Sequence, residues 1–416
     1  MKLQGRLHRT LPWLAVIAVF GAGCDVDPTL GLQQPAADVS RRMADRPEAK
    51  EPADDTGEAG GGAQAPDGEP APRPTGDSRY GAGKTGPAAE SCATDGQRVR
   101  SAGAIGSGGT FLLEGGTYNG LRVPSGATVK PFDCEKVTIR GTVSLANGAT
   151  LAGVTVTSDA GWVINIGGRN ITLRHNAISG GSTETVRIRD NATNVRLDGN
   201  TLDGGRNNHV VKVKSESSGQ HPTDIVIHNN RFTKTHYSSS SEDLLQLEGH
   251  RNVTITNNTF ANNPRGEDGV DVKQGTQGMV MRRNHFLGGN INSECLLVQG
   301  SYAKNIVENN HFENCNAISL GAHPEARLRP WWRFAGNLVE DSELRLRRSE
   351  NAMVVNNVMV GGVLKLGIAG GDDVPRNPTV SGNKLTNVSI ANRVAGDITC
   401  ANNAMSKVSG DALRCS

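Results

Sequence analysis

The chain has 416 residues, and its 44 Lys and Arg against 42 Asp and Glu give a formal net charge of +2 at pH 7. This near-neutral total hides a basic region, because residues 1–24 carry +3 and residues 25–90 carry −6, which leaves +5 for residues 91–416. A basic region favours a polyanionic partner. Nucleic acid is not the partner we expect, because the chain begins with an export signal.

Residues 1–24 have the organisation of a signal peptide. Three basic residues precede the apolar run LPWLAVIAVF, which is too short to span a membrane, and the segment ends in GAGC. This end resembles the lipobox of bacterial lipoproteins, with Gly21 where a leucine is usual, and the resemblance implies acylation of Cys24. We predict an exported lipoprotein anchored to a membrane, either periplasmic or at the cell surface. The alternative is ordinary cleavage nearby, which would give a secreted protein.

Residues 25–90 form a second compositional zone. They are rich in Pro, Gly, Ala, Asp and Glu, almost lack aromatic residues, and contain 13 acidic and 7 basic side chains. Such a segment cannot bury enough apolar surface to offset the entropy lost on ordering. We expect a disordered tether between the anchor and the domain of residues 91–416.

Within that domain, a short phrase of β-branched residues, polar residues and an asparagine occurs ten times, at intervals of 20 to 30 residues. Such a period indicates a solenoid, and no helical period of useful length is present. We predict an all-β, monomeric, right-handed parallel β-helix of about ten or more coils. Asparagines stacked at equivalent turns are expected to form a hydrogen-bonded ladder. The repeated asparagines are Asn176, Asn200, Asn230, Asn258, Asn284, Asn310, Asn337, Asn357, Asn383 and Asn403.

Six cysteines remain after Cys24, and an even number in an exported chain suggests disulfide bonds. Fifteen connectivities are open, and none of the pairs has the spacing of a metal site. The partners closest in sequence are Cys92 with Cys134, Cys295 with Cys315, and Cys400 with Cys415.

A second strand follows each asparagine, and most of these strands alternate apolar and polar residues, as a strand with one buried face should. Aligning their apolar residues gives two rows of outward positions, basic at both ends and acidic in the middle. We interpret these rows as a groove for a negatively charged chain; the alternative is a solvated face. The rows are Arg187, Lys212, Gln246, Asp271, Leu297, Ser319, Arg345 and Lys365, and Arg189, Lys214, Glu248, Lys273, Gln299, Gly321 and Arg347.

The acidic middle comes from two neighbouring coils that open with the same pair, Glu242-Asp243 and Glu267-Asp268, followed by Asp271. Carboxylates gathered in this way repel unless a hard cation binds them, and an all-oxygen set suits Ca²⁺. Asp243 and Asp268 each lie an even number of residues before an inward-facing strand residue, so a continuous strand would point them into the core. They can face outward only if the strand begins after a turn, and Gly269 permits such a turn. Alternatively, the aspartates cap turns.

The segment EDGVDVK, preceded one coil earlier by an acidic pair, resembles the calcium sites of pectate lyases and related polysaccharide lyases. The resemblance implies that Asp243, Glu267, Asp268 and Asp271 hold Ca²⁺, with Glu267 in place of an aspartate. In one such family the catalytic lysine lies on the following coil, where this chain has CLLV. In another, a lysine of the same segment lies in the active site, and Lys273 matches it.

The reaction implied is β-elimination on an acidic, uronate-containing polysaccharide, in which calcium stabilises the developing charge and a base removes a proton. Lys273 is the expected base, and only when the metal offsets Asp271; Lys214 and Arg345 are the fallback bases. The residues expected to hold substrate carboxylates are Arg187, Arg189, Lys212, Arg347 and Lys365.

The segment HPEARLRPWWRF interrupts one repeat with three arginines and two tryptophans. On a loop, Trp331 and Trp332 would stack on sugar rings or cover the edge of the stack. His209, His236 and His323 are interpreted as polar loop residues.

Two functions remain open besides the lyase. One is a non-catalytic β-helix that binds a polysaccharide or a cell-surface partner. The other, a hydrolase or epimerase, is disfavoured because the motifs Gly-His-Gly and Asp-Pro-His are absent from the chain.

Overall fold

The computed structural model describes residues 92–205, 209–217, 219–235, 242–299, 305–321, 331–368, 373–394, 398–413 and 415. The predictions for the signal peptide with Cys24, for the tether, and for His236 and His323 lie outside these residues. Within the described part of the chain, no helix is long and apolar enough to cross a membrane.

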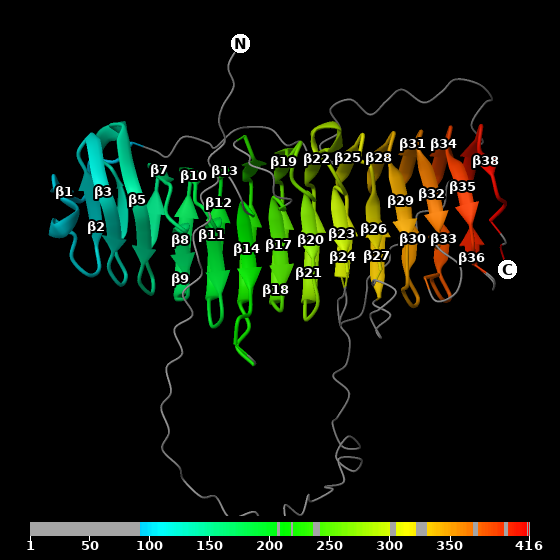
Figure 1. Ribbon diagram of the computed structural model, residues 1–416, viewed down its shortest axis with the longest axis horizontal. Helices are drawn as coiled ribbons and strands as arrows, with labels where there is room; N and C mark the ends of the chain where they lie inside the picture. The colour runs from blue at the N-terminus through cyan, green and yellow to red at the C-terminus, as the bar shows by residue number, and fades with distance from the viewer. Residues whose placement is uncertain are drawn as a thin grey trace, which may run out of the picture. The chain divides into compact units, whose positions relative to one another are not determined.

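Strands are the dominant element, and they fall into three columns along the stack (Figure 1). The first column is one sheet of fourteen strands. It contains β1 Gln97–Val99, β2 Thr110–Leu113, β4 Thr128–Pro131, β6 Thr150–Ala152, β9 Arg169–Arg174, β12 Thr193–Asp198, β15 Thr223–His228, β18 Arg251–Thr256, β21 Gln277–Arg282, β24 Asn305–Glu308, β27 Trp332–Ala335, β30 Met353–Val355, β33 Thr379–Ser381 and β36 Thr399–Ala401.

The second and third columns begin together in the long strands β3 Gly116–Val123 and β5 Val137–Leu145, because β5 pairs with both β7 and β8. The second column continues through β7 Thr155–Ser158, β10 Ala177–Gly180, β13 Thr201–Gly204, β16 Arg231–Thr233, β19 Thr259–Asn262, β22 His285–Leu287, β25 His311–Glu313, β28 Leu338–Glu340, β31 Val358–Val360, β34 Lys384–Thr386 and β37 Ala404–Ser406.

The third column holds the second strands that the sequence analysis predicted after the repeated asparagines. It contains β8 Trp162–Ile166, β11 Glu184–Arg189, β14 Val211–Lys214, β17 Leu245–Glu248, β20 Val270–Val272, β23 Leu296–Val298, β26 Ile318–Leu320, β29 Glu343–Leu346, β32 Val363–Leu366, β35 Ser389–Asn392 and β38 Ser409–Gly410.

Every strand pairs in parallel with the equivalent strand of the next coil, and eleven coils, from β6–β8 to β36–β38, contain all three strands. Short β-branched strands with one inward face suit such a stack, because each coil buries its apolar residues only against its neighbours. The predicted right-handed parallel β-helix of about ten or more coils is confirmed.

The asparagine ladder runs without interruption from Asn176 to Asn403. At each step the side-chain Nδ2 of one asparagine donates to Oδ1 of the next, as from Asn258 to Asn284 at 3.0 Å. The backbone N–H of Asn258 donates to the same oxygen at 2.9 Å. The residue before each ladder asparagine has positive φ, as in Gly199 and Asn257, a conformation that glycine and asparagine adopt most readily. The predicted structural role of these asparagines is confirmed.

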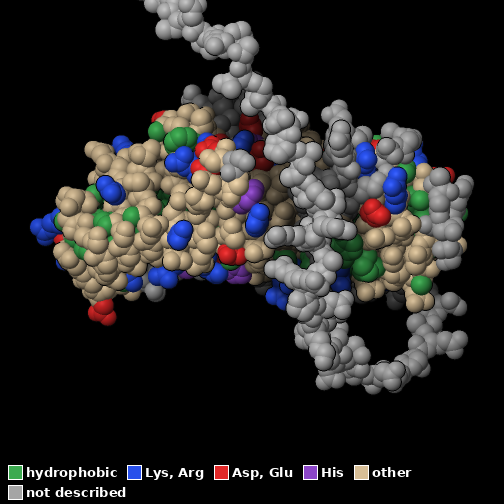
Figure 2. Space-filling view, turned by 90° about the horizontal axis from the view of Figure 1, so that it is seen from below, with side chains coloured by type: hydrophobic (Ala, Val, Ile, Leu, Met, Phe, Trp, Pro, Cys, Tyr) green, Lys and Arg blue, Asp and Glu red, His purple; other side chains and the backbone are tan. Residues whose placement is uncertain are grey.

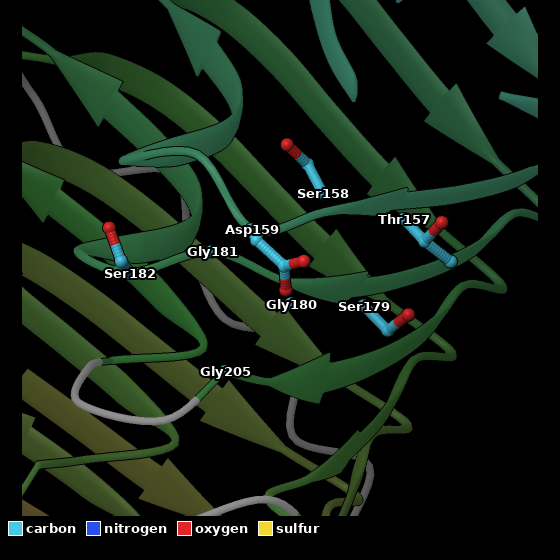
Figure 3. Close-up of a pocket in the computed structure, with 8 residues that line it drawn as sticks. All are labelled: Thr157, Ser158, Asp159, Ser179, Gly180, Gly181, Ser182 and Gly205. Carbon is cyan, nitrogen blue, oxygen red and sulfur yellow. The ribbon is translucent and has the colours of Figure 1, made fainter. Parts of the chain in front are cut away.

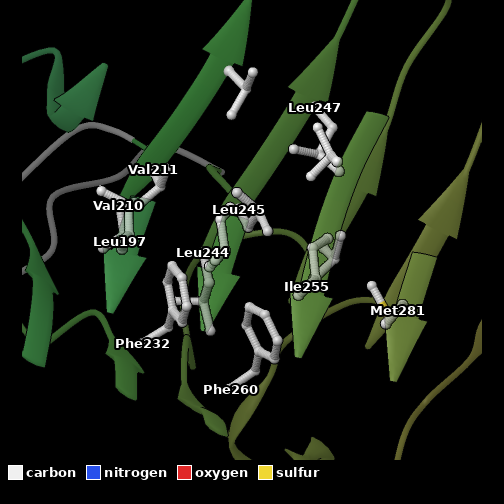
Figure 4. Close-up of a cluster of buried hydrophobic side chains, with 14 of the residues drawn as sticks. Leu197, Val210, Val211, Phe232, Leu244, Leu245, Leu247, Ile255, Phe260 and Met281 are labelled. Atoms are coloured by element: carbon white, nitrogen blue, oxygen red, sulfur yellow. The ribbon is translucent and has the colours of Figure 1, made fainter. Parts of the chain in front are cut away.

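Inside the stack, equivalent residues of neighbouring coils lie in contact. Phe232, Phe260, Phe286 and Phe312 are fully buried, and each successive pair of rings stacks with centroids 4.7 Å apart. Figure 4 shows Phe232 and Phe260 side by side in the apolar cluster that includes Leu244. This close-packed interior gives the outward residues of the neighbouring strands a fixed spacing.

Three disulfide bonds join the pairs that are closest in sequence: Cys92–Cys134, Cys295–Cys315 and Cys400–Cys415. Cys400–Cys415 closes the last coil, where Ile398 also bridges to Cys415. Short 3-10 turns are the helical elements of the described residues: η1 Ala102–Ala104, η2 Phe132–Cys134 and η3 Gly288–Asn290.

Candidate functional site

The outward positions of the third column form the predicted row, residue by residue. The backbone register pairs Arg187 with Lys212, Lys212 with Gln246, Gln246 with Asp271, and so on to Lys365. Neighbours in this row are therefore separated by about 4.8 Å, the spacing between paired strands. The row extends over eight strands because each coil keeps its register while its loops vary in length.

Three carboxylates meet where the turns enter β17 and β20. Asp243, Asp268 and Asp271 are at most 3% exposed, and each offers an oxygen within 4.8 Å of the others. Asp243 lies before the start of β17 and Asp268 before the start of β20. The turn that outward-facing aspartates require at these positions is therefore present. Gly269 is needed there because a Cβ at that position would lie 2.6 Å from the carbonyl oxygen of Cys295.

The cluster is electrostatically unfavourable when it holds no cation. Burial and the nearby charge of Asp243 raise the pKa of Asp268 to about 8, and the same two causes raise the pKa of Asp271 to about 7. Oδ1 of Asp271 is buried and has no hydrogen-bond partner. The carboxylates of Asp243 and Asp268 each accept a hydrogen bond from a backbone N–H group. The N–H of Asp268 donates to Asp243 at 3.1 Å, and the N–H of Glu294 donates to Asp268 at 2.8 Å. The aspartates thus accept hydrogen bonds from backbone N–H groups at the turns, and their carboxylate oxygens also lie close enough together that they could hold a cation.

Glu267, expected as a fourth ligand, does not join the three aspartates. Its side chain is exposed, and its backbone N–H donates to the carbonyl of Glu242 at 3.2 Å. The grouping of ligand atoms therefore includes Asp268 of this pair and not Glu267. The charge of Glu267 nonetheless acts on Lys273 and Lys234.

His209 belongs to the site, and its interpretation as a polar loop residue is wrong. It is 5% exposed, with Nε2 2.8 Å from Glu242 and Nδ1 3.2 Å from Oδ2 of Asp243. Burial opposes a charge on this ring, yet the hydrogen bonds of the ring to the carboxylates of Asp243 and Glu242 raise its pKa. The strand alignment carried a signal for this contact, because His209 precedes Val211 by two residues as Asp243 precedes Leu245, and these two strand residues are paired.

Lys273 lies at the edge of the cluster, with Nζ 3.0 Å from Oδ2 of Asp271 and about one-third of its side chain exposed. Burial disfavours the charged amine, but the charge and hydrogen bond of Asp271 outweigh it and raise its pKa. Asp271 therefore favours the protonated form of Lys273, as the sequence analysis predicted. Lys214 pairs with Glu248 at 3.2 Å, and Arg345 pairs with Glu294 at 2.9 Å and with Glu343.

A second lysine, Lys234, also lies among these charges and was not anticipated. It follows β16, its side chain is fully buried, and its Nζ has no hydrogen-bond partner. Burial lowers its pKa despite the opposing charges of Glu242, Asp243 and Glu267. Since none of its surface is exposed, Lys234 influences the cluster through its charge rather than by touching a ligand.

The cations expected to hold a polyanion are ion-paired within the protein. Arg187 contacts Glu184 at 3.3 Å and also Glu216, and Lys365 contacts Glu343 at 2.8 Å. On the face seen in Figure 2, Lys and Arg are scattered with acids among them. The remaining pairs are Arg189–Glu216 at 3.6 Å, Lys212–Glu184 at 4.0 Å and Arg347–Asp373 at 3.5 Å.

The two tryptophans have different environments, and the placement of Trp332 on a surface loop is wrong. Trp332 begins β27 and is 1% exposed within the core, because it occupies the inward position paired with Asn305. A side chain buried in this way cannot stack on a sugar. Trp331, one residue earlier, is half-buried and remains a candidate contact.

A separate hollow lies nearer the N-terminus, where β7 and β10 turn into the third column. Its volume is about 670 Å³, and the residues around it are mainly glycines and hydroxyl side chains, with Asp159 and Ser182 on the turns (Figure 3). The three clustered aspartates do not line it. The candidate site is therefore distinct from this hollow, and its three aspartates are buried.

These features define a right-handed parallel β-helix protein with a buried acidic cluster on one face. Residues 219–404 match the family described as "Right handed beta helix region". Comparison with curated proteins gave no match.

Several solved structures are similar to the chain. The surface adhesin PfbA of Streptococcus pneumoniae is 15% identical, with a TM-score of 0.47, over 74% of this chain and 84% of that one. The pectate lyase Pel9A is 10% identical, with a TM-score of 0.37, over 73% and 72%. A mannuronic acid specific polysaccharide family 6 lyase from human gut microbiota is 12% identical, with a TM-score of 0.37, over 75% and 79%. The similar structures thus include lyases and an adhesin, and at these identities they assign no activity.

Proposed function

We propose that the protein is a calcium-dependent lyase that cleaves an acidic, uronate-containing polysaccharide such as pectate by β-elimination. The observation that carries this proposal is the meeting of Asp243, Asp268 and Asp271 beside Lys273 on the outer face of the third column. A reactive base next to a cation site is the pair of groups that elimination beside a carboxylate requires.

The three aspartates fit a hard divalent cation. They supply only carboxylate oxygens, one of which is buried without a partner, and calcium prefers oxygen ligands. Bound by Asp243, Asp268 and Asp271, Ca²⁺ would stabilise the charge that develops on the substrate carboxylate. Glu267, exposed on the same turn, would be available to the outer side of the site.

Lys273 is the proposed base, because its amine reaches solvent while the amine of Lys234 is buried. The neutral amine would take the proton from the sugar carbon that bears the carboxylate. The electron pair then forms a double bond to the adjacent ring carbon, and the glycosidic carbon–oxygen bond of that carbon breaks. The departing oxygen takes a proton from water.

The flanking cations would hold the neighbouring sugar carboxylates. Arg187, Arg189 and Lys212 lie on one side of the acidic cluster, with Arg345, Arg347 and Lys365 on the other. A polyanion would exchange acidic partners for its own carboxylates at low cost where the ion pair is partly exposed, as for Arg189–Glu216 and Lys365–Glu343. The pairs of Arg187 with Glu184 and of Arg347 with Asp373 are more deeply buried, so breaking them costs more.

Export agrees with the three disulfide bonds, which persist in oxidising compartments. Anchoring through a lipid on Cys24 and a monomeric state remain predictions.

The second candidate function is a non-catalytic binder of polysaccharide or of a cell-surface partner. The ion pairing of the ladder cations and the raised pKa of Lys273 favour it, because both oppose turnover. An assay of ultraviolet-absorbing unsaturated uronate, run on pectate, alginate and glycosaminoglycans with calcium and with chelator, separates the two. Formation of unsaturated product that requires calcium supports the lyase. Binding of a glycan, with no product from any of these polysaccharides, supports the non-catalytic binder.

A further inference from the structure

Two histidines and two glutamates gather on the second column, on strands β22, β25 and β28. The register pairs His285 with His311, and Glu313 with Glu340. Phe286 and Phe312 point inward between them and are buried, so the histidines and glutamates share the outer side of the sheet. This group belongs to a different column from the acidic cluster and has no part in the proposed elimination.

Each histidine reaches the glutamate of the next coil. Nε2 of His285 lies 3.3 Å from Oε2 of Glu313, and Nε2 of His311 lies 2.6 Å from Oε2 of Glu340. The two imidazole rings stack with centroids 4.5 Å apart and an angle of 2° between their planes. The side chains of both histidines are less than one-fifth exposed, which restricts their rotamers.

We propose that His285, His311 and Glu313 bind a divalent transition-metal ion of the zinc class. One donor atom from each already lies within 4.8 Å of the other two. Around a tetrahedral zinc ion, with Zn–N bonds of about 2.0–2.1 Å, neighbouring donors lie about 3.3 Å apart, so a small contraction completes the site. Two imidazoles with a carboxylate suit zinc, whereas the all-oxygen aspartate cluster suits calcium.

The surroundings favour the ligating form of the ring. Burial and the neighbouring ring of His311 lower the pKa of His285, although Glu313 opposes them, and the neutral imidazole is the metal ligand. Glu340 contacts one nitrogen of His311, and a carboxylate on a ring nitrogen is the common outer partner of a metal-binding histidine.

Binding has a geometric consequence. A metal lies near the plane of each imidazole that binds it, and two parallel planes cannot both contain one ion. The rings must therefore rotate toward each other, and their stacking is lost when the ion binds. The ion would join neighbouring coils that the Cys295–Cys315 bond also joins, so it should raise the melting temperature.

The test is a titration of the oxidised full-length protein with Zn²⁺ by calorimetry and with Co²⁺ by visible absorption, since cobalt reports imidazole ligands in a tetrahedral site. We expect one equivalent to bind, with affinity reduced at least about tenfold in His285→Gln and in His311→Gln. His228→Gln is the matched control, because His228 is also half-buried and bonds a neighbouring coil, at Thr256. Asp268→Asn should leave this binding unchanged.

A measurement on the unaltered protein guards against misfolded variants. Zinc should protect His285 and His311, but not His228, from modification by diethyl pyrocarbonate, as read by mass spectrometry. Equal modification with and without zinc, or the same zinc affinity in His285→Gln and His311→Gln as in the unaltered protein, would overturn the proposal.

Discussion

The ammonium nitrogen of Lys273 lies 3.0 Å from Oδ2 of Asp271, whose other oxygen is buried without a partner. This contact raises the pKa of Lys273 even though burial opposes the charge. As long as Asp271 is ionised and holds no cation, it therefore keeps the proton on the lysine. A cation on Asp271 removes that hold, so metal binding and the basicity of Lys273 are linked through one contact.

Replacement of Lys273 tests its role as the base. Lys273→Ala should lower turnover by at least about a hundredfold, the usual contribution of a positioned general base, and should leave calcium binding largely intact. The measurement is the initial rate of unsaturated product together with a calcium titration. Lys214→Ala is the companion variant, since Lys214 is a fallback base and is also an outward lysine paired with a carboxylate. Unchanged turnover in Lys273→Ala would move the base elsewhere, and to Lys214 if turnover is lost in Lys214→Ala.

The acidic cluster predicts how stability changes with pH. The folded pKa values of Asp268 and Asp271, about 8 and about 7, exceed the ordinary value of about 3.9. The protonated groups therefore favour the folded state, and the stability they give is full below about pH 4 and lost as pH rises towards about 8. In chelator, the melting temperature should be lower at about pH 8.5 than at about pH 5.5.

Calcium should reduce this difference, because the ion stabilises the carboxylates in their charged form. Asp268→Asn should also reduce it, since the amide oxygen still accepts from the N–H of Glu294 and carries no charge. A pH dependence in chelator that is unchanged by Asp268→Asn would show that other groups cause it.

The asparagine ladder predicts that the loss of stability on replacing an asparagine depends on its position in the ladder. Asn284→Ala removes the oxygen that accepts from both the backbone N–H and Nδ2 of Asn258, and it leaves the carbonyl of Ile255 without its donor. Buried groups left unpaired cost about 1–3 kcal/mol each, so denaturant unfolding should show a loss of several kcal/mol. Asn403→Ala, at the partly exposed end of the ladder, should cost less because water replaces the lost bonds. Equal costs at both positions would contradict a cooperative buried ladder.

The two adjacent tryptophans provide a further pair of matched variants. Trp332→Ala leaves a cavity in the core and should reduce the free energy of unfolding by about 3–5 kcal/mol. Trp331→Ala should change that stability little, and it should weaken glycan binding if Trp331 contacts a sugar. Chemical denaturation and a glycan-binding titration measure the two effects; comparable destabilisation by both would refute the different placements of the two residues.

The repeat and its register could be predicted because they are local. The asparagine with its preceding left-handed residue recurs in every coil, and alternation along each third-column strand fixes which residues, such as Asp271 and Lys273, face outward. Parallel stacking then brings equivalent residues together, so Asp243, Asp268 and Asp271 could be grouped from their spacing alone.

What the sequence did not reveal depends on loops and turns of unequal length. Lys234 reaches the cluster from a segment 8 residues before Glu242, and no period relates it to the other residues. His209 could have been found, because it precedes Val211 by two residues, as Asp243 precedes Leu245 and Asp268 precedes Val270 in the same register. Glu267 was misplaced because the sequence shows an acidic pair but not the direction of the turn. Trp332 was misplaced because the last residues of the interrupting segment, from Trp332 onward, already belong to β27.

The most direct test of the proposed function is the return of calcium to protein that has been stripped with chelator, followed by ultraviolet absorbance during incubation with pectate and other uronate polysaccharides. The structure predicts no unsaturated product in chelator and a rate that rises with calcium to saturation. Lack of product at every calcium concentration, or an undiminished rate in chelator, would contradict a calcium-dependent lyase.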